Sequence, residues 1–187
     1  MKRLSAIVPF ALLTCLALTG CTASGAQTAP APASQATTEV EVDAPEDETP
    51  DGPSFVDGVL TTDEVVINIT DSKVIPVGEK GNEYGDKPVL AIWYDTTNLG
   101  TSDQDITPSE FILQFEAFQD NDPNRENTLD VSGLPDDQYL ESQMENIKAG
   151  GTVANAVAYS LDDTTTPVDL VAGRFGDEIG RMTFKLG

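Results

Sequence analysis

The chain has 187 residues, of which 32 are acidic and 10 are basic, so its formal net charge is −22. Because nucleic-acid phosphates would repel this charge, the composition argues against a nucleic-acid partner. The chain has no histidine, which excludes Ser-His-Asp and Cys-His nucleophile systems and histidine-ligated zinc or iron. An acidic surface of this kind is well solvated and attracts cationic partners or divalent metal ions.

The N-terminus has the layout of a secretory signal peptide. Two basic residues, Lys2 and Arg3, precede an apolar run over residues 6–18, which is too short to span a membrane as a helix. The run ends in the sequence L-T-G-C at residues 18–21, the lipobox pattern that a lipoprotein signal peptidase cleaves before the cysteine. Residues 1–20 are therefore predicted to be removed as a signal peptide.

Cys21 is the predicted site of lipid attachment. Its thiol would take a diacylglyceryl group, and two acyl chains, with about 0.8 kcal/mol for each buried methylene, hold a protein stably at a membrane. We therefore expect palmitate-type acylation of Cys21 and a location on the extracytoplasmic face of the cell membrane. The other cysteine, Cys15, leaves with the signal peptide, so the mature chain has no thiol for a disulfide or for thiolate catalysis.

Residues 21–53 have the composition of a tether. They are rich in alanine, threonine and proline and then in glutamate and aspartate, and they include no aromatic and no basic side chain. Such a segment cannot bury enough apolar surface to offset the entropy lost on ordering, so we expect it to be disordered and sensitive to proteases. As a flexible coil it would span on the order of 30 Å and hold the folded domain away from the membrane.

Residues 54–187 hold 25 acidic and 8 basic side chains, a net charge of −17, and are enough for one domain with its own core. Apolar and polar residues alternate along much of this region, which favours strands. Seven strands are expected, over residues 64–70, 73–77, 89–98, 110–118, 152–161, 167–172 and 179–186, with one short helix within 138–148. Since strands and helices do not alternate, the predicted fold class is all-β, an antiparallel β-sandwich, with a barrel as the alternative.

Three stretches of this domain carry a resemblance to a known family. They are A-I-W-Y-D-T-T-N at residues 91–98, F-I-L-Q-F-E-A-F-Q-D at residues 111–120, and the turn I-K-A-G-G-T at residues 147–152. The chain resembles the immunoglobulin-like domains of unknown function found on lipoproteins of Gram-positive bacteria. The resemblance implies an immunoglobulin-like sandwich without the disulfide of antibody domains, with Trp93 in the core or on a sheet surface, and it carries over no catalytic residue.

The sequence contains no arrangement of residues that indicates catalysis. Ser72 and Lys73 are neighbours on an expected strand and would point to opposite faces, and Gly78 to Gly81 is a plain turn. Carboxylates are plentiful, but a small sandwich gives little sign of the cleft in which a glycosidase pair works. We therefore expect no enzyme activity and no cofactor.

The strongest metal candidate is the sequence D-N-D-P-N that begins at Asp120. Asp120, Asp122 and Asn124 have the alternating oxygen spacing of a calcium loop, but the sixth and twelfth positions hold Arg125 and Val131 in place of glycine and glutamate. Aspartate, asparagine and proline are also ordinary turn formers. A structural turn is therefore favoured over calcium binding, and no metal ligand is assigned.

These features favour a cell-envelope lipoprotein whose β-sandwich acts as a non-catalytic binding or interaction module. Its partners would be the membrane, through the lipid on Cys21, and a protein or cell-envelope component. The alternative is a small-ligand or calcium-binding accessory lipoprotein of a transporter or envelope enzyme. A flat face with exposed Trp93, Tyr94 or Phe118 would favour protein contact, whereas a deep apolar pocket would favour a ligand.

Overall fold

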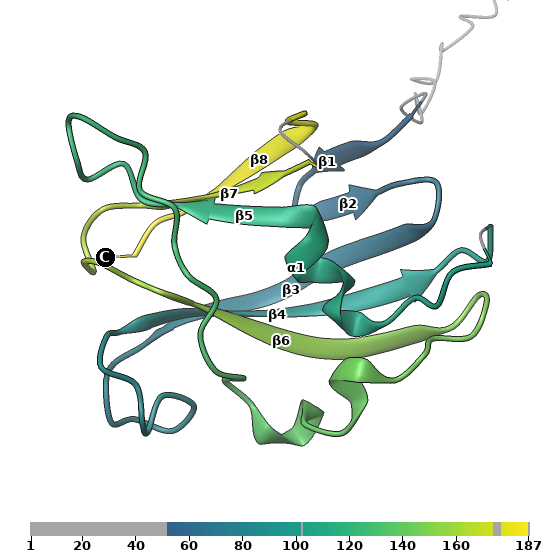
Figure 1. Cartoon of the computed structure of the whole chain (residues 1–187), viewed down its shortest axis with the longest axis horizontal. Helices are drawn as coiled ribbons and strands as arrows, with labels where there is room; N and C mark the ends of the chain where they lie inside the picture. Colours follow the sequence, from purple (N-terminus) through teal and green to yellow (C-terminus); the bar gives the residue numbers. More distant parts are fainter. Residues whose placement is uncertain (1–51, 102, 174–176, 187) are drawn as a thin grey trace, which may run out of the picture. The chain divides into compact units, whose positions relative to one another are not determined.

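The structure is a computed structural model and describes residues 52–101, 103–173 and 177–186. The predicted signal peptide, Cys21 and all but the last residues of the predicted tether lie outside the described residues. The described residues form eight strands in two antiparallel sheets (Figure 1). The strand order is β1-β2-β3-β4-β6 in the larger sheet and β5-β7-β8 in the smaller one. The prediction of an all-β antiparallel sandwich is thereby confirmed.

The elements have the following bounds. The larger sheet consists of β1 (Ser54–Val56), β2 (Val59–Thr61), β3 (Val65–Ile75), β4 (Val89–Asn98) and β6 (Thr152–Ser160). The smaller sheet consists of β5 (Phe115–Phe118), β7 (Val168–Ala172) and β8 (Gly180–Phe184). The helical elements are α1 (Phe111–Gln114) and three 3₁₀ turns, η1 (Pro108–Glu110), η2 (Asp137–Tyr139) and η3 (Ser142–Met144).

The edge of the larger sheet is a hairpin that the sequence analysis missed. Asp57 and Gly58, with φ values of 51° and 80°, form the two-residue turn between β1 and β2. Both values lie in the left-handed region that a type I′ turn requires, and Asp-Gly pairs favour this turn. Each strand has only three residues, which is too short for an alternating pattern to stand out.

Residues 64–70 and 73–77, predicted as two strands, form the single strand β3. A bulge between Ile69 and Asp71 shifts the register of its pairing with β4. The inward-facing positions change parity at the bulge, so the apolar alternation in the sequence is interrupted although the strand continues. The strand ends before Pro76, which has no N–H to donate to a ladder.

The predicted strand over residues 110–118 is wrong in its first half, because α1 precedes β5 there. Phe111 and Gln114 are buried, whereas Ile112 and Leu113 are exposed. Burial at positions three apart is the pattern of a helix and not of a strand. The short helix expected within residues 138–148 is also different, since η2 and η3 are two separate 3₁₀ turns of three residues each.

The core lies between the two sheets. Both sheets contribute buried aliphatic side chains: Leu60, Val65, Ile67, Leu90, Ile92 and Val157 from the larger sheet, and Val168, Leu170 and Ala172 from the smaller one. Four aromatic rings join the layers: Phe111 lies 4.3 Å from Tyr94 and 4.5 Å from Phe115, which meets Phe55 edge to face at 5.0 Å between ring centroids. These contacts connect β1, β4, α1 and β5 in one cluster.

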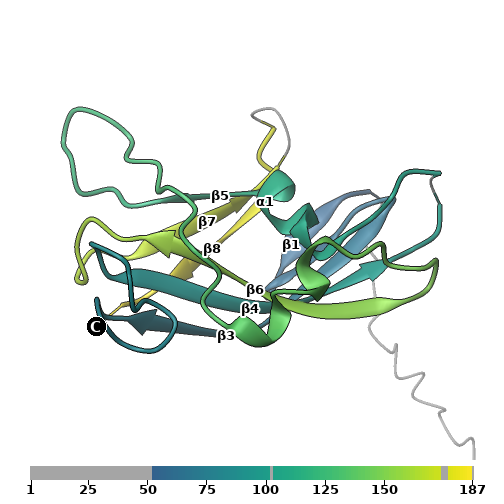
Figure 2. The ribbon, with the colours of Figure 1, turned by 60° about the horizontal axis from the view of Figure 1, so that its bottom comes forward.

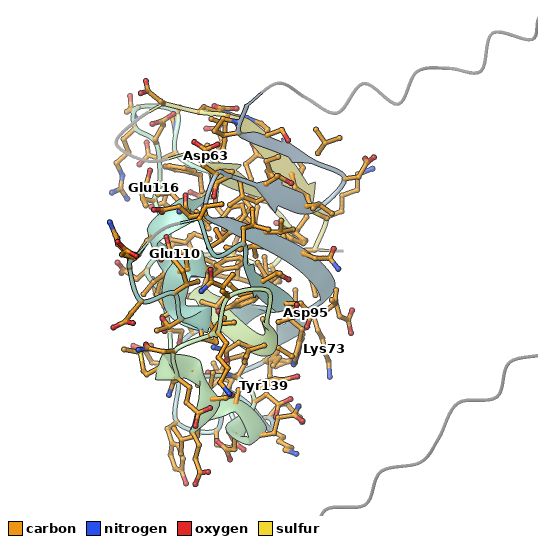
Figure 3. All side chains as sticks on the ribbon, turned by 90° about the vertical axis from the view of Figure 1, so that its right-hand side faces the viewer. Asp63, Lys73, Asp95, Glu110, Glu116 and Tyr139 are labelled. Carbon is orange, nitrogen blue, oxygen red and sulfur yellow. The ribbon has the colours of Figure 1, made fainter. Side chains whose placement is uncertain are left out.

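A smaller apolar cluster covers part of the outer face of the larger sheet. Trp93 packs there against four buried residues, Ile75, Val89, Ala91 and Ala158, and its Nε1 donates to the Asp136 carboxylate at 3.3 Å. Trp93 therefore lies on a sheet surface, as the family resemblance implied. The outer face also carries the polar side chains of Asp95 and Lys73, which Figure 3 shows on the side of the domain away from Glu116.

Two buried tyrosines differ in their hydrogen bonds. The hydroxyl of Tyr94 donates to the carbonyl of Pro108 at 2.9 Å. The hydroxyl of Tyr159 has no hydrogen-bond partner within the described ranges. Burial raises the pKa of both hydroxyl groups, so both are neutral at physiological pH.

These tyrosines make a matched pair of substitutions. Tyr159→Phe removes a hydroxyl that is buried without a partner, so we expect the free energy of unfolding to stay the same or to rise by up to about 1 kcal/mol. Tyr94→Phe leaves the Pro108 carbonyl without its donor, so we expect a loss of about 1 kcal/mol. Urea unfolding of both variants checks this, and an equal loss in the two would contradict the assignment.

Candidate functional site

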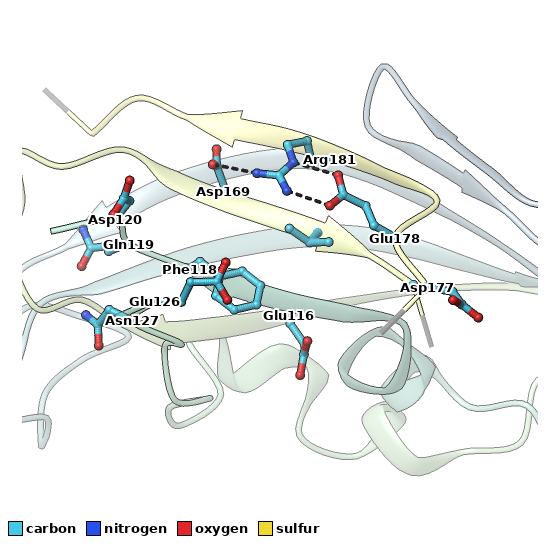
Figure 4. A pocket seen from close by; sticks show the side chains of 12 residues that line it. Glu116, Phe118, Gln119, Asp120, Glu126, Asn127, Asp169, Asp177, Glu178 and Arg181 are labelled. Atoms are coloured by element: carbon cyan, nitrogen blue, oxygen red, sulfur yellow. Dashed lines mark hydrogen bonds and ion pairs between the residues drawn. The ribbon is translucent and has the colours of Figure 1, made fainter. Parts of the chain in front are cut away.

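A hollow of about 390 Å³ lies on the outer face of the smaller sheet (Figure 4). We call it the acidic hollow. Its floor is formed by Glu116 and Phe118 from β5, Asp169 and Val171 from β7, and Arg181 from β8. Successive side chains of a strand point to opposite faces, so these five face outward while their sequence neighbours face the core. The loop after β5 and the segment before β8 form its walls.

Carboxylates outnumber basic groups around the acidic hollow. Arg181 is the only basic side chain that lines it in the described part of the chain, against six carboxylates, those of Glu116, Asp120, Glu126, Asp169, Asp177 and Glu178. Nε and Nη2 of Arg181 donate to the two carboxylate oxygens of Glu178 at 2.8 and 2.7 Å, and Nη1 donates to Asp169 at 3.3 Å (Figure 4). These bonds occupy the guanidinium, and the remaining carboxylates leave an excess of negative charge.

The ion pair at the floor has a direct electrostatic consequence. The hydrogen bonds from Arg181 lower the pKa of the Glu178 carboxyl, which is therefore ionised at neutral pH. Both side chains are exposed to solvent, 51% for Arg181 and 43% for Glu178, so the pair contributes little to stability. The ion pair instead fixes the positions of the Arg181 guanidinium on β8 and of the Glu178 carboxylate just before β8.

Phe118 and Val171 add an apolar part to the floor. Both are half-buried, and the ring of Phe118 lies between the carboxylates in Figure 4. The face of an aromatic ring attracts cations, and carboxylates around it strengthen this preference. The described lining includes no hydroxyl, thiol or amine that could act as a nucleophile. This arrangement suits the binding of a cationic group.

Gln119 holds the loop that forms one wall of the acidic hollow. The residue is 0% exposed. Its Nε2 donates to the carbonyls of Asp163 and Thr166 at 3.0 and 2.9 Å, and its Oε1 accepts from the backbone N–H groups of Asp162 and Asp163 at 2.8 and 3.4 Å. The backbone N–H of Gln119 also donates to the Asn127 carbonyl at 2.9 Å. The loop is thereby joined to the turn that precedes β7.

The D-N-D-P-N sequence, the weak calcium candidate, forms a turn held by its own side chains. The Asp122 carboxylate accepts from the backbone N–H of Asn124 at 2.9 Å and from Nε of Arg125 at 3.0 Å. These bonds lower the pKa of the Asp122 carboxyl. Asp120 lines the acidic hollow, whereas Asn121 donates to the Asp163 carboxylate at 3.0 Å. Over the described ranges, no group of three or more carboxylates is arranged to hold a metal ion.

The other residues considered as catalytic or phosphate-binding belong to a strand and to a turn. Ser72 and Lys73 are consecutive in β3, so their side chains point to opposite faces, as predicted; Ser72 is half-buried and Lys73 is exposed. Gly78 and Gly81 have φ values of 81° and 91° in the loop between β3 and β4. This loop is a turn, as the sequence indicates.

Of the three aromatic residues named as markers of a binding face, only Phe118 lines the acidic hollow. Tyr94 is buried in the core, and Trp93 is partly covered through its contact with Asp136. Sequence reasoning missed that Glu116, Asp169 and Arg181 would meet. Outward alternation in residues 115–118 and 168–172 was the available signal, but the pairing of β5 with β7 was needed to bring them together.

Residues 40–172 match a protein family described as "Domain of unknown function (DUF5067)". The match covers more than half of the chain. The chain belongs to the DUF5067 family. The matched residues include β1 to β7, and thus the floor residues on β5 and β7, and they end before β8 with Arg181.

A solved structure of a candidate lipoprotein from Staphylococcus aureus subsp. aureus NCTC 8325 is similar to this chain, with a TM-score of 0.59. The sequences are 20% identical, and the likeness covers 72% of this chain and 92% of the other, so it shows the fold alone. Among curated proteins, no sequence matches this chain. The family match confirms the coarser part of the resemblance, a domain of unknown function, and the solved structure supports the fold.

Proposed function

We propose that the protein is a cell-envelope lipoprotein, anchored through a lipid on Cys21, whose immunoglobulin-like sandwich is a non-catalytic module that binds a basic partner protein on the extracytoplasmic side. The acidic hollow is the observation that carries this proposal. It combines six carboxylates with the aromatic ring of Phe118 on an outward-facing sheet. Within the described residues, no helix is long and apolar enough to cross a bilayer, and the proposed attachment is the lipid.

The charge of the whole domain supports a basic partner. Residues 54–187 carry a net charge of −17, so a cationic partner is attracted before it makes contact. At physiological ionic strength the screening length is about 8 Å, so this attraction weakens as salt rises. Attachment to the membrane raises the effective concentration of the module for a partner in the same envelope.

A small organic cation is the second candidate ligand. The volume of about 390 Å³ lies within the range of small-molecule pockets, roughly 300–1,000 Å³. The predominance of charged side chains over apolar ones in the lining favours a protein surface, because small-molecule pockets are mostly apolar. Displacement of a bound basic peptide by a small cation, without a change in its salt dependence, would favour this second candidate.

Charge reversal in the acidic hollow is expected to weaken binding of a basic probe. We expect the double variant Glu116→Lys/Asp177→Lys to bind decalysine about ten-fold more weakly than the unchanged chain, because two exposed attractive charges become repulsive. Titration calorimetry at low and high salt measures this. The matched control is Glu79→Lys/Asp103→Lys, which makes the same change in net charge at exposed positions outside the hollow.

The control decides between a site and a general charge effect. If both double variants weaken decalysine binding equally, net charge alone explains the binding and the acidic hollow is not the site. If binding is unchanged at high salt, the electrostatic basis of the proposal is wrong.

A further inference from the structure

A second hollow, of about 110 Å³, opens beside β6 at the edge of the larger sheet. It lies between β6, residues 131–134 and the turns η1 and η3, and we call it the edge pit. Figures 1 and 2 show the short helical turns of residues 137–144 alongside β6, which is the last strand of its sheet. The edge pit shares no lining residue with the acidic hollow.

The edge of β6 is paired over only part of its length. Ser132 N–H donates to the Ala158 carbonyl at 2.8 Å, and Ser160 N–H donates to the Asp130 carbonyl at 2.9 Å. After Ser132, the segment that pairs with β6 turns away from the strand. Because ladder groups alternate along a strand, the N–H and C=O of Ala156 also point away from β4, to the side on which the edge pit lies.

Asn155 places a free donor in the edge pit. The residue is 2% exposed, and its Oδ1 accepts from the Ala156 N–H at 2.8 Å. Its Nδ2 forms no hydrogen bond with any described residue, although Asn155 lines the pit. The Nδ2 atom is open to solvent in the pit, so a ligand carbonyl can take the place of water there. The Asn155 amide and the Ala156 carbonyl thus offer a donor and an acceptor, which matches a peptide group.

The rim of the edge pit is apolar and exposed. Ile112 and Val131 line it and are 46% and 50% exposed. Met144 is 69% exposed, and its sulfur lies 3.2 Å from the hydroxyl of Ser109, another lining residue. A cavity of about 150 Å³ holds benzene. At about 110 Å³ the edge pit suits one branched aliphatic side chain better than the larger indole of tryptophan.

The chain around the edge pit is acidic. Residues 130–147 carry five acidic side chains and no basic one. Asp130, next to Val131, and Glu145, next to Met144, are both exposed. Basic residues on either side of the inserted aliphatic side chain would therefore strengthen the binding of a segment to the pit.

We propose that the edge pit binds an extended segment of a partner protein. The segment inserts one aliphatic side chain between Ile112 and Val131, bonds its peptide group to Asn155 and Ala156, and carries basic residues beside the inserted one. This inference goes beyond the proposed function, because the surface is separate from the acidic hollow. The experiments can therefore disprove binding at one site without affecting the proposal for the other.

Short peptides test the proposed selectivity on the unchanged site. The probe is a capped Lys-Lys-Leu-Lys-Lys peptide, compared with peptides that have glycine or tryptophan at the centre and with one that has glutamate at the flanks. They are titrated into the isotopically labelled whole chain carrying Cys21→Ser. We expect the leucine peptide to bind at least about ten-fold more tightly than the other three. The glycine and tryptophan peptides lack an aliphatic side chain that fits the pit, and the glutamate peptide is repelled by the acidic residues around it. The amide signals of Asn155, Ala156 and Ser132 should shift most.

Rim substitutions locate the binding. Ile112→Ser/Val131→Ser is expected to weaken leucine-peptide binding about ten-fold. Val77→Ser/Leu99→Ser, at apolar residues that are 49% and 42% exposed outside the edge pit, should leave it unchanged. Equal affinity for the leucine and glycine peptides overturns the proposal, and so do shifts confined to the acidic hollow. The comparison of peptides on the unchanged chain stands even if a rim variant folds poorly.

Discussion

Replacing Cys21 with serine is expected to move the protein out of the membrane fraction or to leave its precursor uncleaved. The predicted lipobox at residues 18–21 would direct a diacylglyceryl group to the Cys21 thiol before cleavage, and serine has no thiol to acylate. Since two acyl chains supply stable attachment, loss of the acceptor should abolish membrane binding almost completely. Fractionation followed by immunoblotting measures the change.

A second thiol provides the control for this experiment. Cys15→Ser changes the other cysteine, which lies inside the predicted signal peptide, and should leave membrane attachment intact. Metabolic labelling with palmitate should mark the unchanged protein and Cys15→Ser but not Cys21→Ser. An unchanged protein that never takes up the label would show that the lipobox assignment is wrong.

Replacing Gln119 with leucine is expected to lower the free energy of unfolding by about 3 kcal/mol. The side chain is 0% exposed and makes four hydrogen bonds to backbone groups of residues 162–166. Leucine has a similar size but can satisfy none of these groups, and buried unpaired backbone groups are costly. The wall of the acidic hollow should also loosen, with faster amide exchange in residues 162–166.

The matched control is Gln138→Leu, because Gln138 is exposed and, among the residues that the structure describes, its side chain bonds only to the nearby Asp136 carboxylate, at 2.6 Å. We expect this variant to change the free energy of unfolding by less than about 0.5 kcal/mol. Urea unfolding gives both values. A loss below about 1 kcal/mol for Gln119→Leu would mean that the loop does not depend on this side chain.

The central strands were the part of the fold that the sequence predicted best. β4 was expected over residues 89–98 and occupies them all, because its length and its apolar residues on both faces leave no other assignment. β6 and β7 begin or end within a residue of their expected bounds. Elements whose burial depends on neighbouring elements were harder to predict from the sequence. Phe111 and Leu113 fit a strand pattern, yet only Phe111 is buried, because the chain turns from one sheet to the other at α1.

The binding surfaces could not be predicted from the sequence, for a physical reason. Glu116 and Arg181 are 65 positions apart, and both reach the acidic hollow only because β7 pairs with β5 on one side and with β8 on the other. Alternation shows which side chains face outward but not which strands are neighbours. Asn155 interrupts the apolar residues of β6 in the sequence, but the free edge beside it depends on where residues 130–132 leave β6.

A map of where a basic ligand contacts the domain tests directly whether the acidic hollow is the binding site. Decalysine is titrated into the isotopically labelled whole chain carrying Cys21→Ser, and the amide shifts are recorded at low and high salt. We expect the largest shifts at Glu116, Phe118 and Asp177, with loss of the shifts at high salt. Shifts spread evenly over the acidic surface, or centred away from β5, β7 and β8, would contradict it.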